Sequence, residues 1–254
     1  MRFIPLDEKP HQCGYLPDRN ATYEAYLVLE ATPMEREALL EAGYRSFGKY
    51  YFRPRCIGCH KCIPLRVPVK EFSPTKSQRR AWKRCQGVDL VVDRPRYTVE
   101  KWEIYKEHLH RFNKQESASS PEDFAFSFYD TTIPALEFCY YVEGVLVAVG
   151  IVNVTPNTLS SVYFTYRLEY AKLSLGTYSV LAEIDYARRE GKKHLYLGYF
   201  VKDNHFMSYK ARFHPNEILS SSGQWMQFYD SIGNMWVSEP WQFAPFPFID
   251  TTEP

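Results

Sequence analysis

The chain has 254 residues, and its 31 Lys and Arg almost balance its 30 Asp and Glu, for a formal net charge of +1. A hydrophobic content of 45% with 17% aromatics excludes an intrinsically disordered chain. The longest apolar run, 145–152, is about half as long as a membrane span needs, and the N-terminus lacks the apolar stretch of a secretory signal. We therefore expect a cytoplasmic protein without a membrane partner, whose six cysteines are ligands or buried thiols rather than disulfides.

The near-neutral total hides an uneven distribution of charge. Residues 45–85 hold twelve Lys or Arg and a single acid, Glu71, so this segment carries +11 and the remaining 213 residues carry −10. A division of this size predicts a polyanionic partner for one part of the molecule.

The first half of the chain shows strand and helix patterns around a cysteine loop. Strands are predicted at 23–29, 44–52, 63–72 and 88–92. Helices are predicted at 33–42, between Thr32 and Gly43, at 73–85, and at 98–113. The strands at 44–52 and 63–72 flank the cysteine loop.

The second half predicts antiparallel strands followed by a helix, a strand and another helix. A hairpin is expected at 136–142 and 145–154 around Glu143-Gly144, with a third strand at 159–165. A helix from Ser174 to Gly191, a strand at 194–201, a helical piece at 204–213 and a few short terminal strands follow. This order resembles the GNAT acyltransferase fold. We expect an α+β protein with a small cysteine-bearing N-terminal domain at 1–95 and a GNAT-like domain at 96–254.

A C-x2-C-x2-C loop is the sharpest local motif. Its thiols belong to Cys56, Cys59 and Cys62, and Gly58 allows the backbone to curl around one centre. Cys13 is the natural fourth ligand, with His11 or His60 as substitutes. The spacing predicts an iron–sulfur cluster or zinc and leaves the choice open. Buried free thiols are the alternative, which three cysteines so close together disfavour.

A basic helix is the second signal. Lys76, Arg79, Arg80, Lys83 and Arg84 share one face of the helix predicted at 73–85, with no acid among them. Most charged faces are only solvated, but this one sits beside the cysteine loop in the +11 segment. We expect it to bind nucleic-acid phosphates, with an affinity that falls steeply with salt.

Two segments of the second half carry candidate catalytic groups. Ser174-Leu175-Gly176-Thr177 opens a helix whose first N–H groups can bind an oxygen atom, although Ser174 can also be a plain helix cap. The glycine spacing of an acyl-CoA loop is missing, so we expect no CoA. Gly198 predicts a close approach to its strand, and Tyr209 and Lys210 can point into a cleft; a buried aromatic with a surface lysine is the alternative. No hydrolase or P-loop motif is present.

Together these segments resemble the bacterial aspartate/glutamate leucyltransferases, relatives of the arginyl-tRNA–protein transferases. The likeness lies in Cys13-Gly14-Tyr15-Leu16-Pro17, the C-x2-C-x2-C loop, Pro64-Leu65-Arg66-Val67-Pro68, Ser73-Pro74-Thr75-Lys76-Ser77-Gln78-Arg79-Arg80, Ser174-Leu175-Gly176-Thr177-Tyr178, Tyr196-Leu197-Gly198-Tyr199 and Met207-Ser208-Tyr209-Lys210. The resemblance implies an aminoacyltransferase that moves an amino acid from aminoacyl-tRNA to an N-terminal Asp or Glu and so creates an N-degron. It also implies that the four cysteines 13, 56, 59 and 62 bind a cluster or a metal.

Candidate roles follow from this chemistry. The catalytic candidates are Ser174, Gly176, Tyr209 and Lys210, the tRNA-binding candidates are the five cations of the basic helix, and Arg45 or Arg79 is the candidate for recognising the acidic N-terminus. The resemblance implies leucine as the transferred residue, with arginine as the alternative, because Asn153, Arg167-Leu168 and Phe206 depart from the family pattern. A non-catalytic metal-dependent RNA-binding protein and a small-molecule acetyltransferase are the competing interpretations. We expect a monomer.

Overall fold

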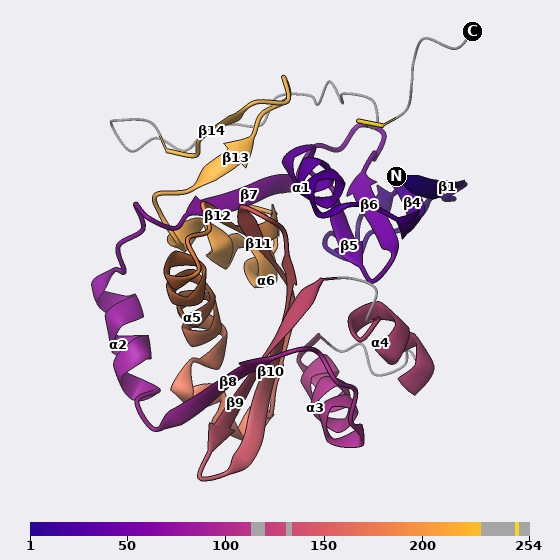
Figure 1. Ribbon diagram of the computed structural model, residues 1–254. Coiled ribbons are helices and arrows are strands. Elements are labelled where there is room, and N and C mark those ends of the chain that lie inside the picture. The colour runs from indigo at the N-terminus through magenta and orange to yellow at the C-terminus, as the bar shows by residue number, and fades with distance from the viewer. Residues whose placement is uncertain (113–119, 131–133, 230–246, 249–254) are drawn as a thin grey trace, which may run out of the picture.

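The computed structural model describes residues 1–112, 120–130, 134–229 and 247–248, and Figure 1 shows it as a mixed α+β protein. A four-stranded sheet has the order β1 (Arg2–Leu6), β4 (Tyr23–Glu30), β6 (Tyr50–Pro54) and β5 (Arg45–Phe47). Two short strands, β2 (His11–Gln12) and β3 (Asn20–Ala21), pair beside it. The predicted α+β class is confirmed.

A second sheet contains eight strands in the order β14-β13-β7-β12-β11-β10-β9-β8. Their bounds are β7 (Ile63–Pro68), β8 (Val88–Asp93), β9 (Ala135–Val142), β10 (Val145–Val154), β11 (Thr158–Tyr166), β12 (His194–Phe200), β13 (Glu217–Leu219) and β14 (Trp225–Gln227). Among the described strands, β11 and β12 form the one parallel pair, joined by helix α5 (Leu175–Arg189). The antiparallel β9-β10-β11, the crossover helix and the parallel β12 give the GNAT-like order that the sequence predicts.

The two sheets do not divide the chain at residue 95. Strands β7 and β8 come from the first 95 residues, but β7 pairs with β12 and β13, and β8 pairs with β9. The small sheet therefore ends with β6, and the rest of the N-terminal segment builds part of the large sheet. The two sheets are therefore not separated by a boundary between residues 95 and 96.

Helices lie on both faces of the large sheet. Besides α5, the described helices are α1 (Pro33–Glu41), α2 (Lys76–Arg84), α3 (Val99–Leu109), α4 (Pro121–Phe128) and α6 (His205–Ser208), with 3-10 turns η1 (His110–Phe112), η3 (Leu168–Leu173) and η4 (Tyr209–Arg212). Of these, α1 packs against the small sheet through Leu39. Thr32 and Thr75 each make a complete capping box, which explains why α1 and α2 begin there. None of the described helices combines the length and the apolar character that crossing a bilayer would need.

Two expected strands need correction, and one helix was missed. The strand expected at 44–52 is a hairpin, because Gly48 takes a positive φ of 54° and turns the chain between β5 and β6. The strand expected at 63–72 ends at Pro68, where the N–H of Phe72 turns back to the Pro68 carbonyl. Helix α4 was not predicted, and the last residue of the helix expected at 98–113 lies outside the described residues.

The main core lies between α5 and the large sheet. Side chains of α5 such as Leu175 and Ile184 pack there with Phe138 of β9 and Leu195 of β12, and all of them are buried. On the opposite face Ile104 of α3 packs against β9 and β10. Helix α5 is thus fixed along its length, while α2 lies beside its first turns (Figure 1).

Candidate functional site

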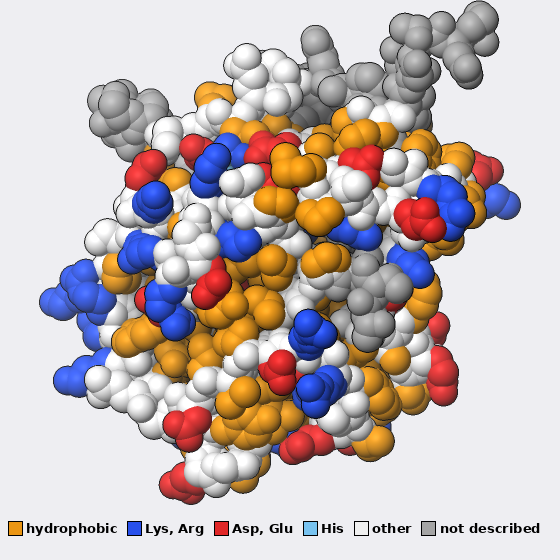
Figure 2. Space-filling view, in the orientation of Figure 1, with side chains coloured by type: hydrophobic (Ala, Val, Ile, Leu, Met, Phe, Trp, Pro, Cys, Tyr) orange, Lys and Arg blue, Asp and Glu red, His pale blue; other side chains and the backbone are white. Residues whose placement is uncertain are grey.

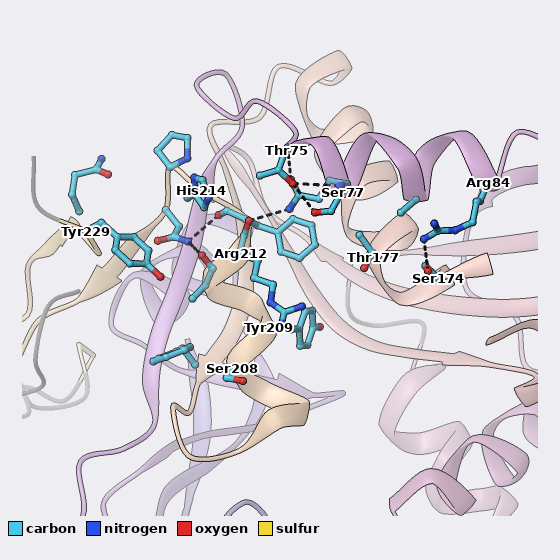
Figure 3. A pocket seen from close by; sticks show the side chains of 18 residues that line it. Thr75, Ser77, Arg84, Ser174, Thr177, Ser208, Tyr209, Arg212, His214 and Tyr229 are labelled. Carbon is cyan, nitrogen blue, oxygen red and sulfur yellow. Dashed lines mark hydrogen bonds between the residues drawn. The ribbon is translucent and has the colours of Figure 1, made fainter. Parts of the chain in front are cut away.

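A cavity of about 1100 Å3 opens between α2, the first turn of α5 and the segment that follows β12. Ser174 and Thr177 line it from the start of α5, Arg84 from the end of α2, and Tyr209 and Arg212 from η4 (Figure 3). The fold therefore brings three predicted site residues, Ser174, Arg84 and Tyr209, from distant segments into one cavity. A concave site with a few convergent polar groups is a candidate ligand site.

Ser174 holds an unusual backbone conformation at the start of α5. Its φ of 63° places it in the left-handed region, and its carbonyl accepts the N–H groups of Thr177 and Tyr178. The side chain makes no cap; instead its Oγ accepts a hydrogen bond of 2.7 Å from Arg84 Nη2. The serine therefore tethers a guanidinium to the helix N-terminus.

The first N–H groups of α5 are available to a ligand. Within the described part of the chain, no hydrogen bond uses the N–H of Leu175 or Gly176. A Cβ added at Gly176 would meet nothing within 4 Å, so the space beside this residue is empty, and Ser174 and Thr177 on either side of these amides line the cavity. Free N–H groups at the positive end of a helix dipole stabilise a negatively charged oxygen.

Tyr209 and Lys210 point to different places. Tyr209 lines the cavity, but the Lys210 side chain is buried away from it, with Nζ donating to the Tyr199 carbonyl at 2.9 Å. The expectation that Lys210 shares the cleft with Tyr209 is therefore wrong, as is the alternative of a surface lysine. Burial, together with the positive charge of Arg45, lowers the pKa of Lys210 to about 7.

Arg45 lies where the two parallel strands of the large sheet separate. Strands β11 and β12 pair only through their first three residues, and beyond them the guanidinium donates to the Ser160 hydroxyl and the Ser161 carbonyl. A Cβ at Gly198 would come within 3.2 Å of Arg45 Nε. The close approach that the sequence predicts at Gly198 is thus made by this guanidinium. Burial lowers the pKa of Arg45.

Glu183 is a buried acid that the sequence did not single out. Its side chain extends from α5 toward the sheet, is 0% exposed, and takes no hydrogen bond of normal length from the described residues. Burial raises its pKa to about 8, and Ser161 and Arg45 offset only part of this effect. Because buried residues surround it along α5 from Tyr178 to Ile184, that apolar run was the available signal.

The five cations of α2 form an exposed and uncompensated surface. All of them are exposed, whereas Gln78 and Ala81 face the interior, and none forms an ion pair among the described residues. Figure 2 shows blue side chains gathered over the edge of the molecule where α2 lies. The predicted one-sided basic helix is present, and Arg84 connects it to the cavity. Arg79 stands on this outer face, so the fold does not bring it together with the buried Arg45.

The four cysteines of the predicted metal site lie near one another. All six cysteines are free thiols, and Cys13, Cys56, Cys59 and Cys62 are partly buried. Burial raises the pKa of Cys62, and the other three thiols raise it further, which places all four in one neighbourhood. Among the described residues, however, no three His, Cys, Asp or Glu side chains are already arranged around a metal position.

Comparisons with known proteins cover most of the chain. The family model for the N terminus of arginine-tRNA-protein transferase matches residues 11–80, and the model for its C terminus matches residues 100–220. An aspartate/glutamate leucyltransferase of Helicobacter hepaticus is 30% identical over 227 residues, covering 87% of this chain and 94% of that protein. One of Pseudomonas putida is 33% identical over 218 residues, covering 83% of this chain and 91% of that protein.

Among solved structures, a crystal structure of FemX matches 78% of this chain and 69% of its own, with 9% identity and a TM-score of 0.47. A likeness this low carries no argument about the fold, which rests on the strand order of the large sheet.

Proposed function

The chain belongs to the aminoacyl-tRNA–protein transferase family, and from this premise we propose that it moves leucine from leucyl-tRNA to the N-terminal Asp or Glu of an acceptor protein, marking that protein for degradation. Full-length relatives named aspartate/glutamate leucyltransferase support leucine as the donor residue. The observation that carries the proposal is the cavity in which Arg84 of the basic helix meets Ser174 at the N-terminus of α5.

The tRNA is held by charge on α2. Its five exposed cations have no acidic partner in the described structure, so their charge is uncompensated and can attract phosphates, although Arg79 and Arg84 also donate to the Pro74 carbonyl and the Ser174 hydroxyl. The end of α2 meets the cavity at Arg84, so an RNA strand on this helix delivers its 3′ terminus to the start of α5. A cavity of about 1100 Å3 is large enough for a terminal nucleoside with its amino acid.

The transfer needs little help from side chains, because the aminoacyl ester is already activated. The acceptor amine, with a reference pKa of about 7.7–8.0, attacks the ester carbonyl; the new amide bond forms, the ester C–O bond breaks, and the tRNA hydroxyl leaves with a proton. The N–H groups of Leu175 and Gly176 stabilise the tetrahedral oxyanion. Tyr209, which also lines the cavity, positions the reacting groups.

Lys210 and Arg45 take supporting roles in this arrangement. Lys210 does not line the cavity, and we assign it to positioning: its Nζ holds the Tyr199 carbonyl below η4, the turn that carries Tyr209. Arg45 is already bonded to Ser160 and Ser161, so a substrate carboxylate must compete with these contacts. Arg79 remains the second candidate for the acidic N-terminus; it is exposed, but it lies on the outer face of α2 and donates to the Pro74 carbonyl.

The four cysteines are the proposed ligands of an iron–sulfur cluster or zinc. Burial raises the pKa of Cys56 and of Cys62, and neighbouring thiols raise both pKa values further, so the cysteines lie close enough to fit such a group. A bound cation would stabilise the four as thiolates. When bound, the group ties Cys13 to the loop of Cys56, Cys59 and Cys62 and rigidifies this edge of the molecule. Metal analysis and a visible spectrum after anaerobic purification distinguish the cluster from zinc.

Arginine is the second candidate for the transferred residue, because both family models carry the arginine-tRNA-protein transferase description. The test incubates the protein with labelled Leu-tRNA or Arg-tRNA and with peptides that begin with Asp, Glu or Met. We expect leucine on the two acidic peptides and none on the Met peptide. Arginine on the acidic peptides would replace leucine as the donor, and no transfer from either tRNA would refute the proposed reaction.

A further inference from the structure

Trp82 is an exposed aromatic side chain within the basic helix α2. It is 41% exposed, and one side of its indole packs against the Tyr178 ring of α5, with the centroids 5.1 Å apart and the planes tilted by 59°. Single exposed apolar residues are common on protein surfaces. The setting of Trp82 is different, because the helix around it is cationic and has no acid of its own.

Helical geometry places Trp82 at one edge of the cationic face and Arg84, which lines the cavity, at the other edge. Successive residues turn by about 100°, so Trp82 lies about 200° around the helix from Arg84, which touches Ser174 at the cavity. Gln78 and Ala81 occupy the inward side between these two positions. An RNA strand that crosses the outward face of α2 from Trp82 therefore arrives at Arg84 and the cavity.

We propose that Trp82 stacks on an unpaired nucleobase of the tRNA acceptor end as this strand crosses α2. The inference rests on the proposed function and adds a base contact to its phosphate contacts. Arg79 and Lys83, at positions i−3 and i+1 from Trp82, hold the backbone while the indole holds the base, which is the combination that binds single-stranded RNA. Contact with Tyr178 already orders the ring, so little conformational entropy is lost on stacking.

The test compares two RNA hairpins in fluorescence anisotropy titrations at several KCl concentrations. One hairpin ends in a single-stranded 3′-CCA, and the other has the same stem without the overhang. Trp82→Leu keeps an apolar contact with Tyr178 but removes the stacking surface, Trp82→Phe keeps a ring, and Lys83→Ala removes a phosphate contact next to it. Phe126→Leu, on α4, is the matched control for an exposed aromatic residue elsewhere; Phe126 is 54% exposed.

We expect Trp82→Leu to weaken binding of the overhang RNA by about 5- to 150-fold, with the salt dependence of the wild type and no change on the blunt hairpin. Trp82→Phe retains most of the affinity, and Phe126→Leu retains all of it. Lys83→Ala weakens both RNAs and lowers the slope of log K against log salt by about 0.7–0.9. Tryptophan emission of the wild type is quenched by the overhang RNA, and Trp82→Phe loses this quenching.

Three results would overturn the inference. The first is that Trp82→Leu binds both RNAs as tightly as the wild type does. The second is that it loses the same affinity for both RNAs. The third is that the wild type shows no fluorescence quenching that Trp82→Phe removes. If the wild type transfers an amino acid normally while one of these results holds, only the role of Trp82 fails. If the wild type binds neither RNA at any salt concentration, the tRNA part of the proposed function fails with it.

Discussion

Replacement of the buried acid Glu183 by glutamine tests the electrostatics of the core beneath α5. Glu183 is fully buried, takes no hydrogen bond of normal length from the described residues, and has a pKa raised from 4.5 to about 8 by burial. The groups around it are the Arg45 guanidinium, the Ser161 hydroxyl and the phenols of Tyr140 and Tyr209. The folded protein therefore keeps this carboxyl protonated at pH 7, whereas the unfolded chain releases its proton near pH 4.5.

The sign of the effect follows from proton binding. Between pH 4.5 and about 8 the folded state binds more protons at this site than the unfolded state, so the free energy of unfolding falls as the pH rises. The loss is about 3 kcal/mol by pH 7 and about 5 kcal/mol above pH 8. Glu183→Gln cannot titrate, so this variant gains stability relative to the wild type across the same pH range.

Urea unfolding at half-unit steps from pH 5 to 9 measures the difference between the two proteins. A constant offset from the buried amide does not affect the result, because the slope with pH is the readout. Glu190→Gln, an exposed change at the end of the same helix, is the matched control and should parallel the wild type. Parallel curves for Glu183→Gln and the wild type would refute the assignment of a raised pKa to this carboxyl.

Three further predictions concern the site. Gly198→Ala lowers the free energy of unfolding by about 1–3 kcal/mol, because φ is 81° and the new Cβ meets Arg45, whereas Gly176→Ala, with nothing near its Cβ, does not; thermal unfolding compares them. Lys210→Met is more stable than the wild type, most of all below pH 7, because the folded wild type must carry a buried charge there and its pKa is about 7. This gain shrinks as the pH rises toward 10.5, so in the same urea series it falls with pH, whereas the gain of Glu183→Gln rises. Ser174→Ala frees Arg84 without unfolding α5, because its Oγ makes no cap; a change in helix content by circular dichroism would contradict this.

Local signals predicted most elements of this fold. Threonine caps mark the starts of α1 and α2, and Glu143-Gly144, with φ of 50° and 80°, forms the tight turn between β9 and β10. The place of β7 in the large sheet had no such signal. Leu65 pairs with Gly198, so the register is set by a strand far along the chain. Pairing over this distance depends on packing, which spacing within one segment does not encode.

The same limit applies to the site. Ser174 and Arg84 were each predicted from their own segments, but their contact spans 90 residues. The burial of Lys210 and Arg45 was not predictable, because long cations are seldom buried unless paired. Their partners are the carbonyls of Tyr199 and Ser161 and the hydroxyl of Ser160. A residue pattern does not show which carbonyls will lack a backbone donor.

In the basic segment 45–85, the cations that remain for a polyanion lie mainly on one helix, α2. Of its twelve cations, five are paired with acids: Lys49 with Asp130, Arg53 and Arg55 with Glu24, Lys61 with Asp203, and Arg66 with Glu41 and Glu217. A sixth, Arg45, is buried against Ser160. Five of the other six are the exposed cations of α2, and the last is Lys70. The charge of +11 therefore overstates the surface that a polyanion meets. A phosphate backbone finds about five sites on α2, so the salt dependence of RNA binding should have a slope near −4, not near −10.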